Sequence, residues 1–258
     1  MKKTLIILAV AASAVVSGSA MAWTKNGIGG TVELGGTLTP ADVVTPWEVY
    51  VGAAVNDLNA DIKKGMKFVD VPVNRAIPVL GIRTITSSTF KGHPGISPQI
   101  DFRGAIDLNK IRNSEATLTI DVKDAAGSKK IGTLSAPLLV YAEYSYTGPY
   151  NGRYVMFASK AGDGFFGGLP LSNKDASLGY YSRIEGISTE FVQKYNDQGQ
   201  KISRSGGAWN FVDGRYDYSA FYGSGIEQSK NIKITLDNPA ISDAIIWKAS
   251  LPVTVFYQ

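Results

Sequence analysis

The sequence has no cysteine and only one histidine among its 258 residues. The lack of cysteine excludes disulfides and thiolate-held zinc, so the chain must be stabilised by its core or by a partner. His93 lies in a predicted loop, with no nucleophile motif to make it part of a Ser-His-Asp arrangement, and we interpret it as a surface residue. The sequence therefore predicts neither a metal site nor a cofactor.

Acidic residues are also poorly arranged for catalysis. Glycosidases need only two carboxylates, and the middle of the chain contains several. We interpret these as solvated loop residues, and the spacing around Asp163 is not that of a calcium loop. The sequence predicts a protein that is not an enzyme; the carboxylates considered are Asp163, Glu185, Glu190, Asp213 and Asp217.

Long apolar runs are lacking except near the start. Lys2 and Lys3 precede an apolar stretch over 5–16, and Ala20-Met21-Ala22 is a small-x-small cleavage site, so residues 1–22 are predicted to be a secretory signal peptide. The alternative, an uncleaved anchor, is disfavoured because the run is short for a bilayer. Removing both lysines lowers the formal charge from +4 to +2. Such a balance does not indicate binding to nucleic acid or to an anionic membrane.

Residues 27–38 alternate between two kinds of side chain, which is typical of a strand with one buried face. Glycine weakens an ordinary strand, but it suits a strand that lies close to another backbone in a narrow groove. The alternative is a plain first strand with a Gly-Gly turn. The row with the apolar side chains consists of Ile28, Gly30, Val32, Leu34, Gly36 and Leu38.

The last stretch of the chain also alternates. One row contains Trp247, Ala249, Leu251, Val253, Val255 and Tyr257. A terminal strand either has a neighbour or presents an open edge. A glycine-rich alternating start and an aromatic alternating end together indicate a sheet that is completed by a strand from another molecule.

Both ends resemble subunits of chaperone–usher pili, and most closely the family of the K88 and F41 fimbrial antigens. The resemblance is carried by residues 1–6 of the leader, by 35–39 followed by 47–52, and by 247–253. It implies that residues 28–38 are a donor strand and that the C-terminal strand binds a periplasmic chaperone. The residues implied in chaperone binding are Leu251, Val253, Val255, Tyr257 and Gln258.

The body of the chain reads as β-structure. Strands are expected at 47–51, 68–73, 77–82, 116–122, 130–134, 136–146 and 232–236, and a short helix at 56–64. Short strands separated by turn signals favour an all-β, immunoglobulin-like sandwich. With the resemblance, we expect this sandwich to lack its last strand and to receive it from another subunit.

The region at about 147–225 differs in composition and is predicted to be an insertion between sandwich strands. It is rich in glycine and aromatic residues, and 182–196 has helical spacing. Flat aromatic faces beside polar groups are typical of sugar sites, although the same rings can form the insertion's own core. The candidate carbohydrate-binding residues are Tyr150, Arg153, Tyr154, Trp209 and Tyr216.

The expected organisation is a signal peptide at 1–22, a donor-strand extension at 23–40 and a pilin-like sandwich at 41–258. The expected function is that of a major or minor structural subunit of a cell-surface fimbria, exported through the periplasm. Its expected partners are a chaperone, an outer-membrane usher, other fimbrial subunits and host glycans. The alternative is a secreted, self-complete protein that binds or cleaves carbohydrate.

Overall fold

The computed structural model describes residues 31–38, 44–241 and 243–258. The chain divides into two units, Met1–Asp42 and Val43–Gln258. In the first unit, residues 31–38 have no regular secondary structure. Among the residues described, no helix is long and apolar enough to cross a bilayer.

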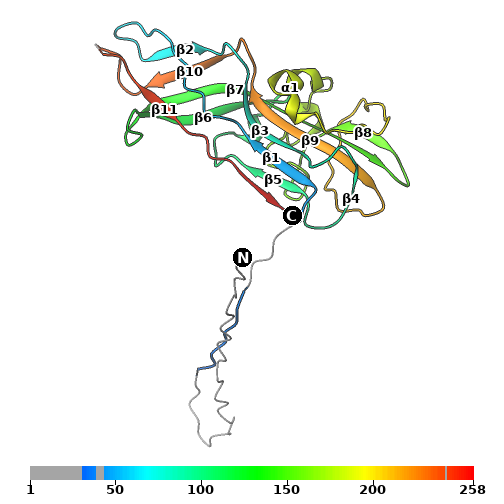
Figure 1. The fold of residues 1–258 in the computed structure, drawn as a ribbon. Helices are drawn as coiled ribbons and strands as arrows, with labels where there is room; N and C mark the ends of the chain where they lie inside the picture. Colours follow the sequence, from blue (N-terminus) through cyan, green and yellow to red (C-terminus); the bar gives the residue numbers. More distant parts are fainter. Residues whose placement is uncertain (1–30, 39–43, 242) are drawn as a thin grey trace, which may run out of the picture. The chain divides into compact units, whose positions relative to one another are not determined.

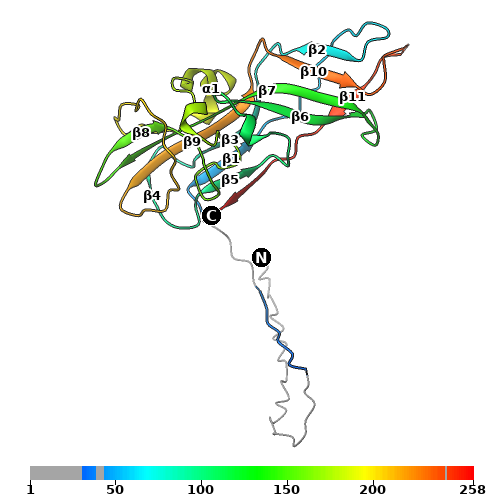
Figure 2. The ribbon, with the colours of Figure 1, turned by 180° about the vertical axis from the view of Figure 1, so that it is seen from behind.

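The second unit is an open sandwich of antiparallel strands with one short helix (Figures 1 and 2). Its strands are β1 (Trp47–Val51), β2 (Phe68–Pro72), β3 (Ile77–Thr84), β4 (Phe90–Lys91), β5 (Pro98–Asp101), β6 (Glu115–Asp124), β7 (Lys130–Thr147), β8 (Gly152–Val155), β9 (Asp217–Ile226), β10 (Asn231–Leu236), β11 (Trp247–Ala249) and β12 (Thr254–Tyr257). The helix α1 is Tyr181–Ile187, and short 3-10 turns are η1 (Leu108–Lys110), η2 (Asn173–Asp175) and η3 (Thr189–Phe191). The prediction of an all-β sandwich is confirmed.

The long strand β7 joins two parts of the sheet. Its first half pairs with β6 and β10, and its second half pairs with β8 and β9. Strand β9 pairs in turn with β3, and β3 with β1. The even-numbered side chains of β7, from Leu134 to Tyr144, lie in the main core, which also receives Leu118 of β6 and Ile234 of β10. The alternation along β6 and β10 matches this buried face.

The opposite face of β7 and β9 packs against one part of the segment between β8 and β9, residues 156–216, whereas Phe165 and Phe211 of the same segment lie in the main core. Ile184, Phe191 and Val192 of this segment form a second core with Tyr141 and Phe221 of the sheet. A side chain at Gly81 or Gly223 would collide with the Phe191 ring, so both strands need glycine there. The insertion expected at about 147–225 overlaps the sheet at both ends, because β8 and β9 are sheet strands. The segment inserted between them is shorter, at 156–216.

One helix prediction was wrong, and another was right in place but too long. Residues 56–64 contain no helix; Leu58 and Ile62, whose spacing imitated one, are half-buried side chains against the main core. The helix expected at 182–196 ends at Ile187, because Ser188 is extended, with φ −158° and ψ 121°. The apolar residues beyond it reach the second core from η3 and the turns that follow.

Candidate functional site

The C-terminal strand has one inward row and one outward row. Leu251, Val253, Val255 and Tyr257 are partly buried against the main core, and each residue between them is exposed. The Tyr257 phenol lies beside Thr45, and burial raises the pKa of that phenol. The expected alternation is therefore present. None of these inward side chains is fully buried, although they face the core.

The same incomplete burial occurs on β1. Val49 pairs with Ile82 and Val51 pairs with Leu80, and directly paired residues project from the same face of a sheet. Ile82 and Leu80 are 0% exposed, whereas Val49 is 41% and Val51 is 63% exposed. The core face of the sheet is thus uncovered along its β1 edge.

The β1 segment and the C-terminal segment meet at both ends. At one end Thr45 lies beside Tyr257, and at the other the Gly65 N–H donates to the Ala240 carbonyl at 2.7 Å. The two segments therefore run antiparallel to each other and border one strip of the core. We call this strip the acceptor groove and define it by its apolar lining, Val49, Val51, Leu251, Val253, Val255 and Tyr257.

Backbone pairing is incomplete along both borders. β1 pairs only with β3, and β12 pairs only with β5, within the part of the chain that the structure describes. Residues 250–253 cross from β11 to β12 outside any strand, and residues 53–62 form no strand either. Backbone N–H and C=O groups require partners once they are buried, so these borders have the capacity to pair with a further strand.

The expected donor strand is only partly visible. Ile28 and Gly30 lie outside the described residues. Within 31–38, Val32 is 81%, Leu34 is 93% and Leu38 is 97% exposed. No atom lies within 4 Å of a Cβ built on Gly35 or Gly36. Side chains at these two glycines are therefore sterically allowed in the subunit itself.

Two of the five candidate sugar-binding residues, Trp209 and Tyr216, belong to a packed aromatic cluster, and a third, Tyr154, joins it from the hairpin by stacking on Tyr144 and Tyr146. Tyr216 is buried, at 6% exposed, and Trp209 donates its indole N–H to the Tyr218 hydroxyl at 2.8 Å. The Trp209 ring stacks on Tyr146, with centroids 5.6 Å apart and planes at 5°. The insertion thus packs its rings against those of β7 and β9, and burial raises the pKa of Tyr146 and of Tyr218 to about 12.

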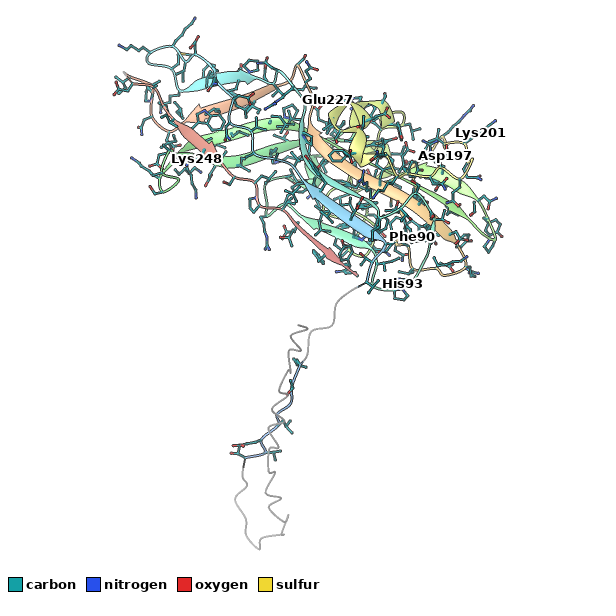
Figure 3. All side chains as sticks on the ribbon, viewed as in Figure 1. Phe90, His93, Asp197, Lys201, Glu227 and Lys248 are labelled. Carbon is teal, nitrogen blue, oxygen red and sulfur yellow. The ribbon has the colours of Figure 1, made fainter. Side chains whose placement is uncertain are left out.

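The other three candidates lie at the β7–β8 hairpin. Tyr150 is 75% exposed in its turn. Arg153 and Tyr154 of β8 line an open, polar pocket of about 390 Å³ with residues of the 199–203 loop. Asp197 and Lys201, labelled in Figure 3, lie together beside this hairpin. The structure brings Arg153 and Tyr154 to one pocket, with Tyr150 close to them in sequence.

A buried ion pair beneath this pocket was not expected from the sequence. Glu143 of β7 is 2% exposed, and its Oε2 accepts hydrogen bonds from Arg153 at 2.8 Å. Tyr141 donates its hydroxyl to the other carboxylate oxygen at 2.5 Å. Asp197 also contacts the guanidinium, at 3.3 Å. A glutamate inside the apolar run of β7 was the one signal that could have revealed this network.

Gln258 and His93, the remaining residues considered in the sequence, both have exposed side chains. Gln258 exchanges two backbone hydrogen bonds with Ser97, at 3.0 and 3.1 Å, and its side chain is exposed. His93 is exposed, and its Nδ1 is 2.9 Å from the Pro94 carbonyl. In the described ranges, no three acidic, histidine or cysteine residues form a group suited to a metal.

Comparison with known proteins agrees with this architecture. The model of a family described as "Fimbrial, major and minor subunit" matches residues 1–258. K88 fimbrial protein AB of Escherichia coli is 29% identical over 291 residues, with 100% of both chains covered. K88 fimbrial protein AD and the F41 fimbrial protein, also of Escherichia coli, are 29% identical over 297 and 283 residues with the same full coverage. The family resemblance expected from the two ends is confirmed. The chain belongs to the family of major and minor fimbrial subunits.

Proposed function

We propose that this fimbrial subunit joins its neighbours by donor-strand exchange, in which residues 28–38 of one copy fill the acceptor groove of the next. The observation that carries the proposal is the groove itself. Val49 and Val51 face the core yet remain exposed, and the opposite border carries a half-buried apolar row. A sheet edge with an uncovered core face is suited to strand addition.

The donor segment and the groove border match in length and pattern. Ile28–Leu38 and Trp247–Tyr257 each span 11 residues and each carry six inward positions. An inserted strand would pair its backbone with both borders, while its apolar row covers the core. Gly36 interrupts that row, which favours a shallow place in the groove at its position.

The expected gain is large enough to hold a fibre. Fully burying one Val, Leu or Ile side chain contributes about 1.5–3 kcal/mol, and four such donor side chains are present. Part of this gain is offset by ordering the donor and by losing the freedom of two separate subunits. The apolar row, rather than surface charge, is thus proposed to supply most of the affinity.

Deleting residues 23–38 tests the proposal. The variant retains its groove, so it should fold, bind a chaperone and reach the periplasm, but surface fibres should be lost. The control replaces residues 23–38 with a scrambled sequence of the same composition, which should also fail to assemble. Normal fibres from the deletion variant would contradict donor-strand exchange.

We further propose that a periplasmic chaperone covers the groove before assembly and that an outer-membrane usher exchanges it for the donor. The support is physical, because an exposed apolar edge promotes uncontrolled association unless it is covered. Gln258 lies at the end of this edge, and we propose that it contacts the chaperone as well. The leader at 1–22 supports export to the periplasm.

A second proposed role is adhesion to host glycans at the β7–β8 hairpin. Tyr150 offers an exposed ring, and Tyr154 and Arg153 line the adjoining pocket. The test is Tyr150→Ala in assembled fibres, with Leu178→Ala, an exposed apolar residue of the insertion, as control. Binding to host cells should fall only in the first variant; equal binding by both would contradict the role of Tyr150. Trp209 and Tyr216 would act indirectly, by holding the aromatic cluster beneath the hairpin.

The proposed role is structural and adhesive rather than enzymatic. Its support is the full-length match to fimbrial subunits. The alternative of a self-complete carbohydrate-binding module is less well supported, because such a module has no need of an uncovered core edge.

A further inference from the structure

The direction of the donor strand determines which ends of two subunits meet. This step rests on the proposed donor-strand exchange. We call the end with Thr45 and Tyr257 the basal end and the end with Gly65 and Ala240 the distal end. In Figure 3, Phe90 and His93 lie at the basal end and Lys248 lies at the distal end. The donor's own subunit begins at its basal end, shortly after Leu38.

Only one of the two directions makes a fibre. If Leu38 of the donor lay at the basal end of the acceptor, the basal ends of the two subunits would meet. Each subunit could then donate its strand to the other, which gives a closed dimer. If Leu38 lay at the distal end, the basal end of one subunit would meet the distal end of the next. This contact is heterologous and leaves an open chain, as a fimbria requires.

The connection between donor and body is short. Residues 39–43 separate Leu38 from Val44, and five residues reach about 18 Å at full extension. The basal end of one subunit is therefore held close to the distal end of its neighbour. Surfaces at these two ends must touch or lie within a short distance of each other.

The distal end carries exposed apolar side chains on two adjacent loops. The loops are joined by the Ala240 N–H, which donates to the Met66 carbonyl at 3.0 Å, and by Lys67 Nζ, which donates to the Asp237 carbonyl at 2.9 Å. Ile241 is 74% and Ile246 is 71% exposed. Exposed apolar side chains at one end of a subunit are typical of interaction surfaces. We call five of them the distal patch: Met66 and Ile241 at the joined loops, Phe68 at the start of β2, and Ile245 and Ile246 on the segment that leads to β11.

The basal end carries a smaller apolar surface. Val44 is 84% and Ile85 is 47% exposed. The two lie together, because the Ile85 N–H donates to the Pro46 carbonyl at 2.9 Å. We call Val44 and Ile85 the basal patch.

We propose that the distal patch of one subunit binds the basal patch of a neighbouring subunit. The neighbour is the one whose donor strand fills the acceptor groove of the first subunit. The occupant is a second copy of this chain. The contact limits bending between neighbours and adds buried apolar area outside the groove. The residues chosen to test the contact are Val44 of the basal patch and Ile246 of the distal patch.

Cysteine cross-linking tests this contact cleanly, because the natural chain has no cysteine. The variant Val44→Cys with Ile246→Cys is assembled into fibres and treated with a short bifunctional maleimide. Cross-linking within one subunit is excluded, since the run 247–257 separates the two ends by about 30 Å. The control pair is Val44→Cys with Leu178→Cys in the insertion. The expected result is a ladder of covalent multimers from the first pair only.

Fibres of the first pair without a ladder would overturn the proposal. Covalent dimers from Val44→Cys alone, as the main product, would show two basal ends together and would also overturn it. If the first pair does not assemble, Met66→Cys replaces Ile246→Cys and the same outcomes apply.

A charge variant separates this contact from donor-strand exchange itself. Ile241→Lys with Ile246→Lys should shorten fibres several-fold while a peptide of residues 23–38 still binds the subunit as before. Fibres of normal length would overturn the proposed contact. Loss of peptide binding would assign these residues to the groove, and would overturn it as well. A different result would contradict donor-strand exchange itself, namely normal fibres from the subunit that lacks residues 23–38.

Discussion

Val49 and Ile82 are paired across β1 and β3 and face the same side of the sheet, yet Val49 is 41% exposed and Ile82 is 0% exposed. The difference arises because Ile82 has the next strand, β9, on its far side, whereas β1 has no further partner among the described residues. An apolar residue that faces the core but touches water indicates a missing neighbour. A donor strand in that place leads to the predictions for the C-terminal strand and for the donor segment.

Tyr257 and Phe256 provide a matched pair in the C-terminal strand. Tyr257 faces the groove, whereas Phe256 faces outward and is 45% exposed. Tyr257→Ser should lower the periplasmic level of chaperone-bound subunit sharply, because it removes a half-buried aromatic side chain that the chaperone is proposed to cover; losing a fully buried one costs about 3–5 kcal/mol. Phe256→Ser should change it little. Immunoblots of periplasmic extracts measure both, and equal levels for the two variants would contradict the assignment of the rows.

Gly36 and Gly35 provide the corresponding pair in the donor segment. Neither has an atom within 4 Å of a built Cβ, so valine at either position should leave the isolated subunit unchanged. In a fibre, Gly36→Val should clash in the groove at a cost of about 1–3 kcal/mol, whereas Gly35→Val should project outward. Electron microscopy of fibre length distinguishes them. Equal lengths would mean that Gly36 does not face the groove.

Arg153→Met should destabilise the subunit strongly. It leaves Glu143 buried without its cation, and breaking a buried ion pair costs about 3–5 kcal/mol. For a domain of this size, the loss corresponds to a fall in melting temperature of roughly 6–20 °C. The control is Arg215→Met, whose pair with Asp213 is exposed and should be dispensable.

Glu143→Gln combined with Arg153→Met should recover part of that stability, since the uncompensated charge is removed. Melting curves of the chaperone-free subunit, complemented by a donor peptide, measure all three variants. No recovery in the double variant would mean that the arginine acts by packing rather than by charge.

Glu227 should make the attachment of α1 sensitive to acid. The hydrogen bond from Arg183, 2.7 Å long, lowers the pKa of Glu227 below its usual value. A lowered carboxyl pKa stabilises the folded state above the unfolded pKa of about 4.3, and this contribution is lost as the pH falls through the folded value. Glu227→Gln should therefore reduce the melting temperature at pH 7, with a difference from wild type that narrows below about pH 4.

The control for this pH dependence is Glu185→Gln on the exposed face of α1. It should leave the melting temperature near that of wild type at both values of pH. A Glu227→Gln deficit that stays constant down to pH 3 would mean that Glu227 acts through its shape and not its charge.

The sequence predicted the strands that alternate, β6, β10 and the C-terminal strand, in which one face is buried. It also predicted the second half of β7, although both faces are buried there. β9 is buried on both faces from Tyr218 to Ile226, so it shows no alternation and was included in the insertion. The false helix at 56–64 had apolar residues at helical spacing, but their burial comes from the core beside them, which no local pattern reveals.

Some candidate sites could be predicted from a local pattern, whereas others depend on contacts between distant parts of the chain. The C-terminal row could be read from alternation, because a strand places alternate residues on one face. The packing of Trp209 against Tyr146 joins residues far apart in the chain, so composition could only indicate that the region is aromatic. The Glu143–Arg153 pair depends on the register of β7 and β8, which was not available before the structure.

Peptide complementation, read by hydrogen exchange, tests the central claim most directly. A peptide of residues 23–38 is added to a subunit that lacks those residues, and amide exchange is followed along the whole chain. The account predicts that exchange slows along both groove borders, at residues 48–62 and 250–257, because their unpaired backbone groups gain a strand. Binding without protection at these borders, or no binding at all, would contradict it.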